Sequence, residues 1–317
     1  MKLPEVTDYS HGISCIDTEQ VRPGLACCYL LRSGDRYAFV ECGTSHSVPG
    51  LLRVLEHRGI APEQVAYVMP THVHLDHAGG AGLLMSRLPQ AQLVMHPRGA
   101  RHMIDPSKLI EGASAVYGPA AVASMYGEIL PVPESRVIVA DDNFKLDFGG
   151  RQLLFLDAPG HARHHYAIWD AESRGIFSGD VFGLSYRETD GPQGPFLFPT
   201  TTPVQFEPEA WQRTLDRFLA LDPAWVYLTH YGRVGDVGRL ARVLRRGIAH
   251  YERLARHHAD APHRHRKLKE ALTLHTLEEL RAMGAPLSEA QARELLAFDM
   301  ELNTQGLEVW LDRQKAA

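Results

Sequence analysis

The sequence has little of what would direct a protein to a membrane or out of the cell. Its first twenty residues hold no apolar stretch long enough for a secretory signal peptide. The chain also lacks the apolar run of about 18 residues that a transmembrane helix requires. We therefore expect a cytoplasmic protein that does not contact membranes.

Cysteine is scarce, with four residues at positions 15, 27, 28 and 42. Their spacing matches neither a structural zinc site nor a redox pair. Because we expect a reducing cytoplasm, the simplest interpretation is four small, reduced side chains in the core.

Excess positive charge is absent as well. The chain has 33 Lys and Arg against 38 Asp and Glu, which gives a formal net charge of −5. This balance argues against nucleic acid as a partner. The partner that we expect is a small-molecule substrate. The most basic run, residues 263–269, is typical of a solvated helix face.

Alternating strand-like and helix-like patterns predict an α/β fold up to about residue 235. Residues 25–40 form two apolar runs around Ser-Gly-Asp, which indicates a hairpin. Further strands are predicted at residues 65–69, 92–95, 137–140, 151–156, 166–169, 175–177 and 225–228. Helices are predicted at 48–58, 83–88 and 207–221, with a helix-rich insertion at about 98–129.

After about residue 236 the sequence contains only helical patterns, rich in Leu, Ala, Arg and Glu. Ser288, with Gln291 three residues later, is a capping box that marks the start of one of these helices. We expect a catalytic domain at residues 1–235 and a helical C-terminal extension at 236–317 that packs on it. The apolar faces of these helices also leave a homodimer open.

A cluster of metal-binding residue types follows the strand predicted at 65–69. His72, His74, Asp76 and His77 lie within six residues, just before a glycine-rich stretch. In extended backbone, His72 and His74 would point to the same side, because side chains alternate along a strand. Imidazole and carboxylate groups together suit zinc, iron or manganese, so this loop is a candidate metal site.

Three further candidates occupy comparable positions. His161, Asp180 and His230 each follow the end of a predicted strand. A lone histidine or aspartate in a loop is usually only a solvated polar group. Their agreement with the first cluster points to a single site at one edge of a sheet, where loops shape a pocket.

This pattern of H-x-H-x-D-H, Gly-His, Asp and a late His resembles that of the metallo-β-lactamase superfamily, over roughly residues 20–235. The resemblance implies an αββα sandwich of two mixed sheets covered by helices, with two divalent metal ions at one edge. It also implies the ligand set. The first ion would be held by His72, His74 and His161, the second by Asp76, His77 and His230, with Asp180 bridging both.

Details of the pattern favour one part of the superfamily. The antibiotic-hydrolysing members resemble one another in carrying Cys or Ser at the bridging position, where this chain has Asp180. Flavodiiron members carry Glu at the position of His74. The Gly179–Asp180 pair is instead similar to glyoxalase II enzymes and lactonases. One departure is unexplained by the sequence: Glu41-Cys42-Gly43 stands where the family usually has Asp-x-Gly.

We therefore expect a dinuclear metal-dependent hydrolase, with zinc favoured, that cleaves a thioester, lactone or other ester through a metal-bridging hydroxide. Asp76 would also orient the nucleophile or carry the proton to the leaving group. The alternative is a non-haem iron redox protein or dioxygenase with the same ligand set. Native metal content distinguishes the two.

Several residues close to the predicted ligands in the sequence are weaker candidates for a role in the site. His164 and His165 are candidates for orienting a ligand imidazole, although an ordinary strand or surface histidine fits them equally well. Substrate contacts are predicted at Tyr231, Phe182 and Tyr186. The alternative is that these are ordinary aromatic side chains of the hydrophobic core. The role of the 98–129 insertion, which could form a lid, is open.

Overall fold

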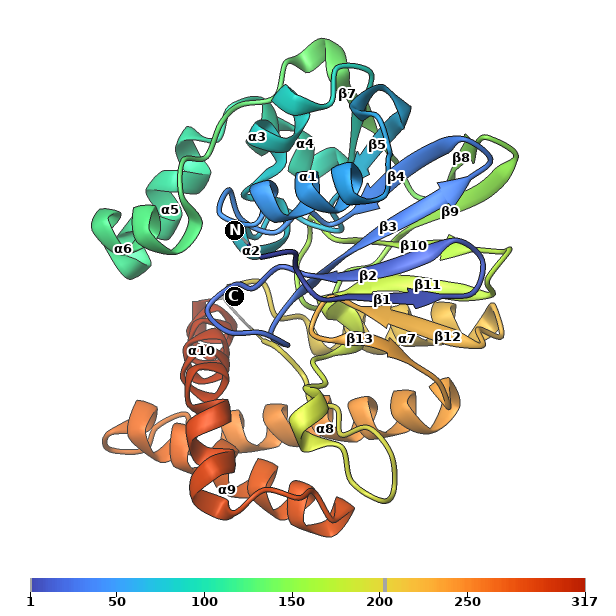
Figure 1. Cartoon of the computed structure of the whole chain (residues 1–317). Helices are drawn as coiled ribbons and strands as arrows, with labels where there is room; N and C mark the ends of the chain where they lie inside the picture. The colour runs from blue at the N-terminus through green and yellow to red at the C-terminus, as the bar shows by residue number, and fades with distance from the viewer. Residues whose placement is uncertain (1, 202–203, 317) are drawn as a thin grey trace. The chain divides into compact units, whose positions relative to one another are not determined.

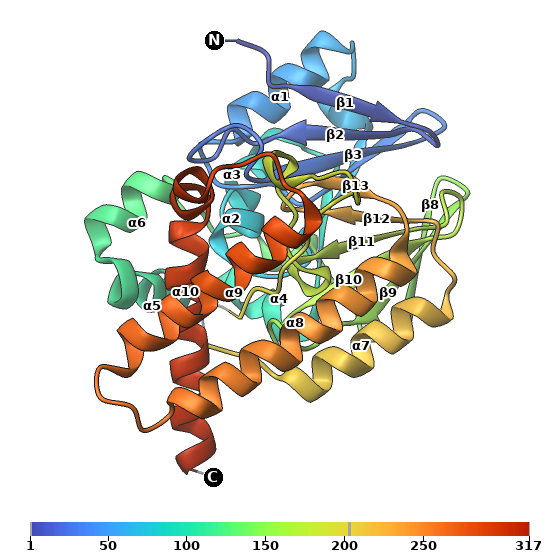
Figure 2. The ribbon, with the colours of Figure 1, turned by 90° about the horizontal axis from the view of Figure 1, so that it is seen from below.

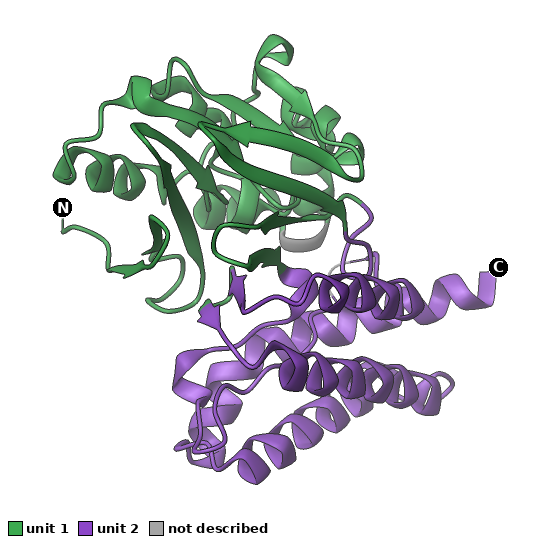
Figure 3. Ribbon diagram, turned by 90° about the vertical axis from the view of Figure 1, so that its right-hand side faces the viewer, with its two compact units in different colours: residues 1–157, 164–179, 229–232 green, residues 158–163, 180–228, 233–317 purple. Residues whose placement is uncertain are grey.

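The computed structural model describes residues 2–201 and 204–316, which form two compact units (Figure 3). Unit 1 comprises residues 1–157, 164–179 and 229–232, and unit 2 comprises residues 158–163, 180–228 and 233–317. The division at residue 235 stays a prediction. The chain crosses between the units several times, so each unit is assembled from distant parts of the sequence.

Unit 1 contains a mixed seven-stranded sheet in which β1 to β7 follow one another in chain order (Figure 1). The first four strands are antiparallel, and β4 to β7 are parallel. The predicted hairpin at 25–40 is confirmed as β3 and β4, with Ser33 opposite Arg36. The strands are Val6–Tyr9, Ile13–Asp17, Cys27–Ser33, Arg36–Val40, Val65–Met69, Gln92–Met95 and Val137–Val139.

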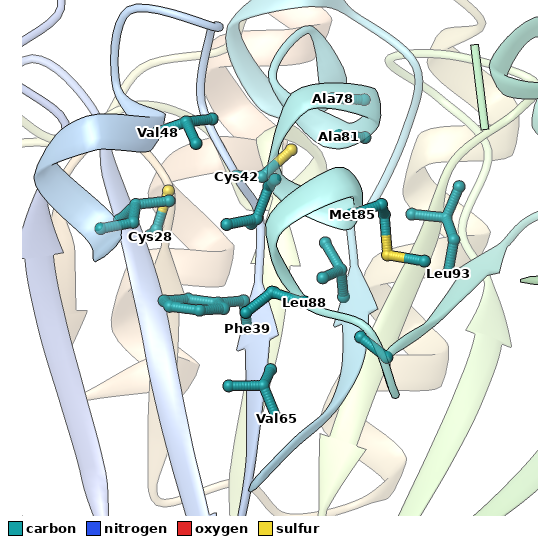
Figure 4. Packing of buried hydrophobic residues seen from close by; sticks show 14 of the residues in the cluster. Cys28, Phe39, Cys42, Val48, Val65, Ala78, Ala81, Met85, Leu88 and Leu93 are labelled. Atoms are coloured by element: carbon teal, nitrogen blue, oxygen red, sulfur yellow. The ribbon is translucent and has the colours of Figure 1, made fainter. Parts of the chain in front are cut away.

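Helices of unit 1 pack on this sheet through a continuous apolar core (Figure 4). In α1 (Val48–His57), the buried residues Val48, Leu51, Val54 and Leu55 recur at helical spacing and form one apolar face. Cys28 and Cys42 belong to this core, as the scarcity and spacing of cysteine predicted. The other helices of unit 1 are α2 (Leu75–Ala78), α3 (Ala81–Arg87), α4 (Pro97–Ile104), α5 (Ser107–Tyr117) and α6 (Pro119–Tyr126).

Four strands of a second sheet also lie in unit 1, in the antiparallel order β11-β10-β9-β8. They are Phe144–Phe148, Arg151–Asp157, Tyr166–Asp170 and Gly175–Gly179, numbered β8 to β11. The two sheets face each other through aromatic side chains. The rings of Tyr29 and Phe177 lie 5.2 Å apart, and those of Tyr67 and Phe148 lie 6.0 Å apart. This face-to-face packing forms the second core of unit 1.

Unit 2 is mainly helical. Helices α7 and α8 run side by side in it (Figure 2). Its elements are η3 (Asp180–Phe182), η4 (Arg187–Thr189), α7 (Pro208–Ala220), β12 (Trp225–Leu228), β13 (Gly232–Val234, whose first residue belongs to unit 1), α8 (Val237–His258), α9 (Arg264–Met283) and α10 (Glu289–Ala316). The helical C-terminal extension is thus confirmed.

The capping box predicted at Ser288 is present at the start of α10. The Gln291 amide donates to Ser288 Oγ at 3.3 Å, and the Ser288 amide donates to Gln291 Oε1 at 3.0 Å. These two bonds satisfy backbone N–H groups that have no partner inside the helix. Across residues 2–201 and 204–316, no helix is both long and apolar enough to cross a membrane.

Candidate metal centre

The histidine-rich loop follows β5, which ends at Met69, and leads into α2. His72 is fully buried and His74 is half-buried, and the backbone at His74 is extended. His72 Nε2 lies 2.8 Å from His74 Nδ1. The two imidazoles therefore converge, as their two-residue spacing predicted.

A second group of donors gathers in the same unit. Asp76, His77 and His230 each offer one ligand atom, and these three atoms lie within 4.8 Å of one another. Asp76 Oδ2 is 3.5 Å from His77 Nε2 and 3.4 Å from His230 Nε2. The fold of unit 1 thus brings the loop after β5 together with residue 230. Both histidines are buried, whereas the Asp76 side chain is 27% exposed.

Glu41 connects the chain segments that carry these donors, and the sequence alone did not reveal this role. Its side chain is 1% exposed. Glu41 Oε1 accepts from His77 Nδ1 at 3.0 Å and from the hydroxyls of Thr71 and Thr229 at 2.5 and 3.0 Å. Glu41 Oε2 accepts from the Thr71 amide at 3.0 Å. The carboxylate therefore holds the residues just before His72 and His230.

These contacts decide which ring nitrogen each histidine presents. A carboxylate only accepts, so His77 donates from Nδ1 to Glu41, and in the neutral imidazole the lone pair then lies on Nε2. His230 Nδ1 lies 2.8 Å from the Leu25 carbonyl oxygen, which likewise makes it the donor. The Thr71 hydroxyl donates to Glu41, so it accepts from His72 Nδ1 at 3.1 Å.

In all three neutral rings, Nε2 is therefore the atom left with a lone pair for a metal. This arrangement, in which a protein oxygen holds the remote nitrogen, is the usual support of a metal-bound histidine. The donor set of imidazoles and carboxylates suits zinc, iron or manganese. The residues of unit 1 fit divalent metal binding.

Two predicted ligands lie together in unit 2. His161 and Asp180 are both buried, with His161 Nε2 3.5 Å from Asp180 Oδ2. His161 Nδ1 donates to the Thr200 carbonyl at 3.0 Å, so this ring also presents Nε2. Gly160 lies before His161 with a φ of +139°, and a Cβ atom there would lie 2.6 Å from Trp211 Cα. Only glycine fits this close approach.

His164 and His165, the two histidines predicted to orient ligand rings, pack against the histidine-rich loop in unit 1. The His165 ring is fully buried and stacks on His72 with 4.7 Å between ring centroids. The His164 ring lies 5.3 Å from His74 and 6.1 Å from His72. Both are placed to restrict the ligand rings by packing. Their role in orienting ligands stays a prediction.

The three predicted substrate contacts differ in exposure. Phe182 and Tyr186 are buried in unit 2, and the Tyr186 hydroxyl donates to Asp299 at 2.9 Å. Tyr231 is half-buried in unit 1, and its hydroxyl donates to Asp17 Oδ2 at 3.4 Å. Burial, reinforced by nearby Cys15, raises the pKa of Tyr231, which keeps this hydroxyl protonated. Substrate contact by these residues stays a prediction.

Comparison with known proteins decides the family. The family model of the metallo-β-lactamase superfamily matches residues 21–230 of this chain. The chain belongs to the metallo-β-lactamase superfamily. Its fold is therefore the metallo-β-lactamase fold, with two mixed sheets flanked by helices, as predicted. The superfamily consists mostly of hydrolases and also has non-hydrolytic members.

The chain is similar to an archaeal protein of the same superfamily. The metallo-β-lactamase fold-containing protein ST1585 of Sulfurisphaera tokodaii is 24% identical over 216 residues, which cover 67% of this chain and 75% of that protein. Its crystal structure matches with a TM-score of 0.64 at 21% identity, and the match covers 94% of this chain and 99% of that one.

Two other similar proteins have a known activity or metal centre. The human acyl-coenzyme A thioesterase MBLAC2 is 25% identical over 173 residues, which cover 48% of this chain and 57% of the thioesterase. This chain therefore spans little more than half of that protein. The structure of a peroxy diiron species of the chemotaxis sensor ODP matches with a TM-score of 0.53 at 14% identity, and the match covers 77% of this chain and 94% of that one. At such identity the likeness shows the fold alone.

Proposed function

We propose that the protein is a dinuclear metal-dependent hydrolase that cleaves a thioester, a lactone or another ester. The observation that carries the proposal is the convergence of Asp76, His77 and His230 in unit 1, with ligand atoms within 4.8 Å of one another. Superfamily membership supports hydrolysis, and the similarity to an acyl-coenzyme A thioesterase favours thioesters among the three substrate classes.

The ligand assignment follows the family pattern and stays a prediction. We assign His72, His74 and His161 to the first ion, Asp76, His77 and His230 to the second, and Asp180 to both. Zinc is the metal that we favour, and iron or manganese also suits these donors.

When bound, two divalent ions bring the pKa of a water molecule toward neutrality and polarise the carbonyl that is attacked. The chain's own residues fix the geometry around them. Glu41 and the Leu25 carbonyl hold His77 and His230 by Nδ1, so neither ring can rotate without breaking a hydrogen bond that is buried at His77 and partly buried at His230. Preorganised donors cost no rearrangement during the reaction.

Asp76 is the residue that we assign to proton transfer. It contacts two imidazoles, yet its side chain is 27% exposed, whereas those of His77 and His230 are 0% and 7% exposed. A carboxylate at the solvent-facing side of the group can orient the attacking water and pass a proton to the leaving group.

A substrate panel tests the proposal. We would compare an acyl-coenzyme A thioester, a lactone and a phosphodiester, using wild type, Asp76→Asn and a matched control, Asp35→Asn, which changes an exposed turn residue. We expect hydrolysis of the thioester or the lactone, a loss of about 100-fold or more in Asp76→Asn, and no change in the control. Turnover of neither ester class, or full activity in Asp76→Asn, would overturn the proposal.

The second candidate is an iron-dependent redox protein. The structural neighbour with a diiron centre shows that this fold accommodates iron. The metal content of protein purified without added metal separates the two candidate functions. Bound zinc supports hydrolysis, whereas iron with a visible charge-transfer band supports redox chemistry. The small-molecule substrate, the cytoplasmic location and the homodimer stay predictions.

A further inference from the structure

Unit 2 contains a cavity that the proposed reaction does not use. It has a volume of about 490 Å³ and lies between α8, α9 and the segment 196–199. None of the predicted metal ligands lines it. Small-molecule sites typically measure about 300–1,000 Å³, so the cavity has the size of a binding site.

One wall of the cavity is apolar. Phe196, Leu197 and Phe198 line it and are at most 4% exposed, so little of their surface reaches solvent. The rings of Phe196 and Phe198 lie 5.9 Å apart and nearly parallel, at 24°. Such a wall stabilises the apolar body of a ligand through removal of surface from water.

Two stacked histidines add a flat surface. His250 of α8 and His275 of α9 lie with ring centroids 3.6 Å apart and planes 14° apart. Burial lowers the pKa of both imidazoles, and the neighbouring Arg253 lowers them further, against the opposing effect of Glu278 and Glu279. The rings are thus uncharged near neutral pH and extend the apolar wall.

The cavity lining carries more positive than negative charge. Arg245 is paired with Asp216 at 2.6 Å, outside the cavity lining. Arg246 is exposed and has no ion pair or hydrogen bond among the residues that the structure describes. Arg253 donates to a neutral imidazole and keeps its full charge. Against these two arginines stands Glu279, which leaves one net positive charge.

We propose that this cavity binds a small organic anion with an apolar body and a single carboxylate. The apolar wall recognises the body, and the guanidinium of Arg246 recognises the carboxylate, for which its planar fork is suited. Because only one net positive charge faces the cavity, a singly charged head group fits better than a multiply charged phosphate. The inference does not depend on the hydrolase proposal, since it concerns other residues.

Calorimetric titration of the full-length protein tests the inference with octanoate as the probe. Octyltrimethylammonium and inorganic phosphate serve as comparison ligands, one with the wrong charge and one without the apolar body. We expect saturable binding of octanoate and none of the other two. Arg246→Ala should weaken binding about tenfold, because Arg246 is exposed and its charge-assisted hydrogen bond then contributes near the lower end of the usual range, about 1.5 kcal/mol. Arg242→Ala is the matched control, because Arg242 is exposed on the same helix and does not line the cavity.

A second variant shows where octanoate binds. Ala249→Phe places a large side chain in the lining and should abolish binding while thermal unfolding stays cooperative. The inference is overturned by any of three results. The first is that octanoate does not bind to the wild type. The second is that Arg246→Ala binds octanoate as tightly as Arg242→Ala does. The third is that Ala249→Phe still binds octanoate while Asp76→Asn does not. The last result would place octanoate at the metal centre.

Discussion

Replacing Glu41 by glutamine tests how the buried network of unit 1 supports the metal ligands. The glutamine side chain has nearly the same shape, so the core around it is preserved. Its carbonyl oxygen can take the place of Oε1, which accepts from His77, Thr71 and Thr229. Its amide group then takes the place of Oε2 and faces the Thr71 amide, which is also a donor.

The structure sets the size of the effect. One buried N–H group loses its acceptor, which costs about 1–3 kcal/mol, and three charge-assisted bonds become neutral and weaker. We expect a loss of about 2–4 kcal/mol in the free energy of unfolding. Because His77 and the residue before His230 are held less firmly, metal affinity should fall about 10–100-fold.

Urea unfolding and competition with a metal chelator measure the two effects. Glu56→Gln is the control, because Glu56 is exposed on α1 and should change neither quantity. Glu41→Asp is a second test. Its side chain is one methylene shorter and cannot reach all four hydrogen-bond partners of Glu41, so this variant should also bind metal more weakly. Wild-type metal affinity and stability in Glu41→Gln would refute the role that we assign to Glu41.

Three further predictions concern stability. Asp170→Ala should cost about 3–5 kcal/mol in urea unfolding, because the buried Arg151 loses its carboxylate partner at 2.9 Å and keeps only the half-exposed Glu172, at 4.0 Å. Replacing both Arg151 and Asp170 by apolar residues should recover much of the loss, and equal losses in the two variants would contradict this. Gly179→Ala should cost about 2–4 kcal/mol, because φ is +50° and the new Cβ would lie 2.3 Å from Thr71 Oγ1; an unchanged melting temperature would show that the turn adapts. A hydrogen bond from Lys269 lowers the pKa of Glu301 from 4.5 to about 2, so the stability from this pair is full above pH 4.5 and is lost as the pH falls toward 2. Unfolding of Glu301→Gln should therefore depend less on pH in that range than unfolding of wild type, and identical pH profiles would count against the pair.

Local sequence patterns predicted most of the fold because they reflect local physics. The strand at 65–69 and the helix at 48–58 were predicted within one residue of β5 and α1. Their signals, an apolar run before proline and an amphipathic period before glycine, do not depend on the rest of the chain. The short helix α2 (Leu75–Ala78) was missed, since one turn of helix leaves no periodic pattern.

The site was predicted in part for a similar reason. The donors in the loop after β5 are visible as a cluster in the sequence. His230 was added to them because it follows a predicted strand and because the family pattern includes a late histidine. Glu41 was noticed as a departure from that pattern, but its role was not predictable. Its partners Thr71 and Thr229 lie 30 and 188 residues away along the chain, and hydrogen bonds of that separation leave no local signal.

The metal content of protein purified without added metal tests the central claim most directly. Elemental analysis should find two divalent ions per chain in wild type and in His57→Ala, which changes an exposed histidine at the end of α1. His230→Ala and Asp180→Ala should each retain fewer ions, with circular dichroism unchanged. A wild-type protein that binds no divalent metal, or variants that keep the full content, would contradict the account.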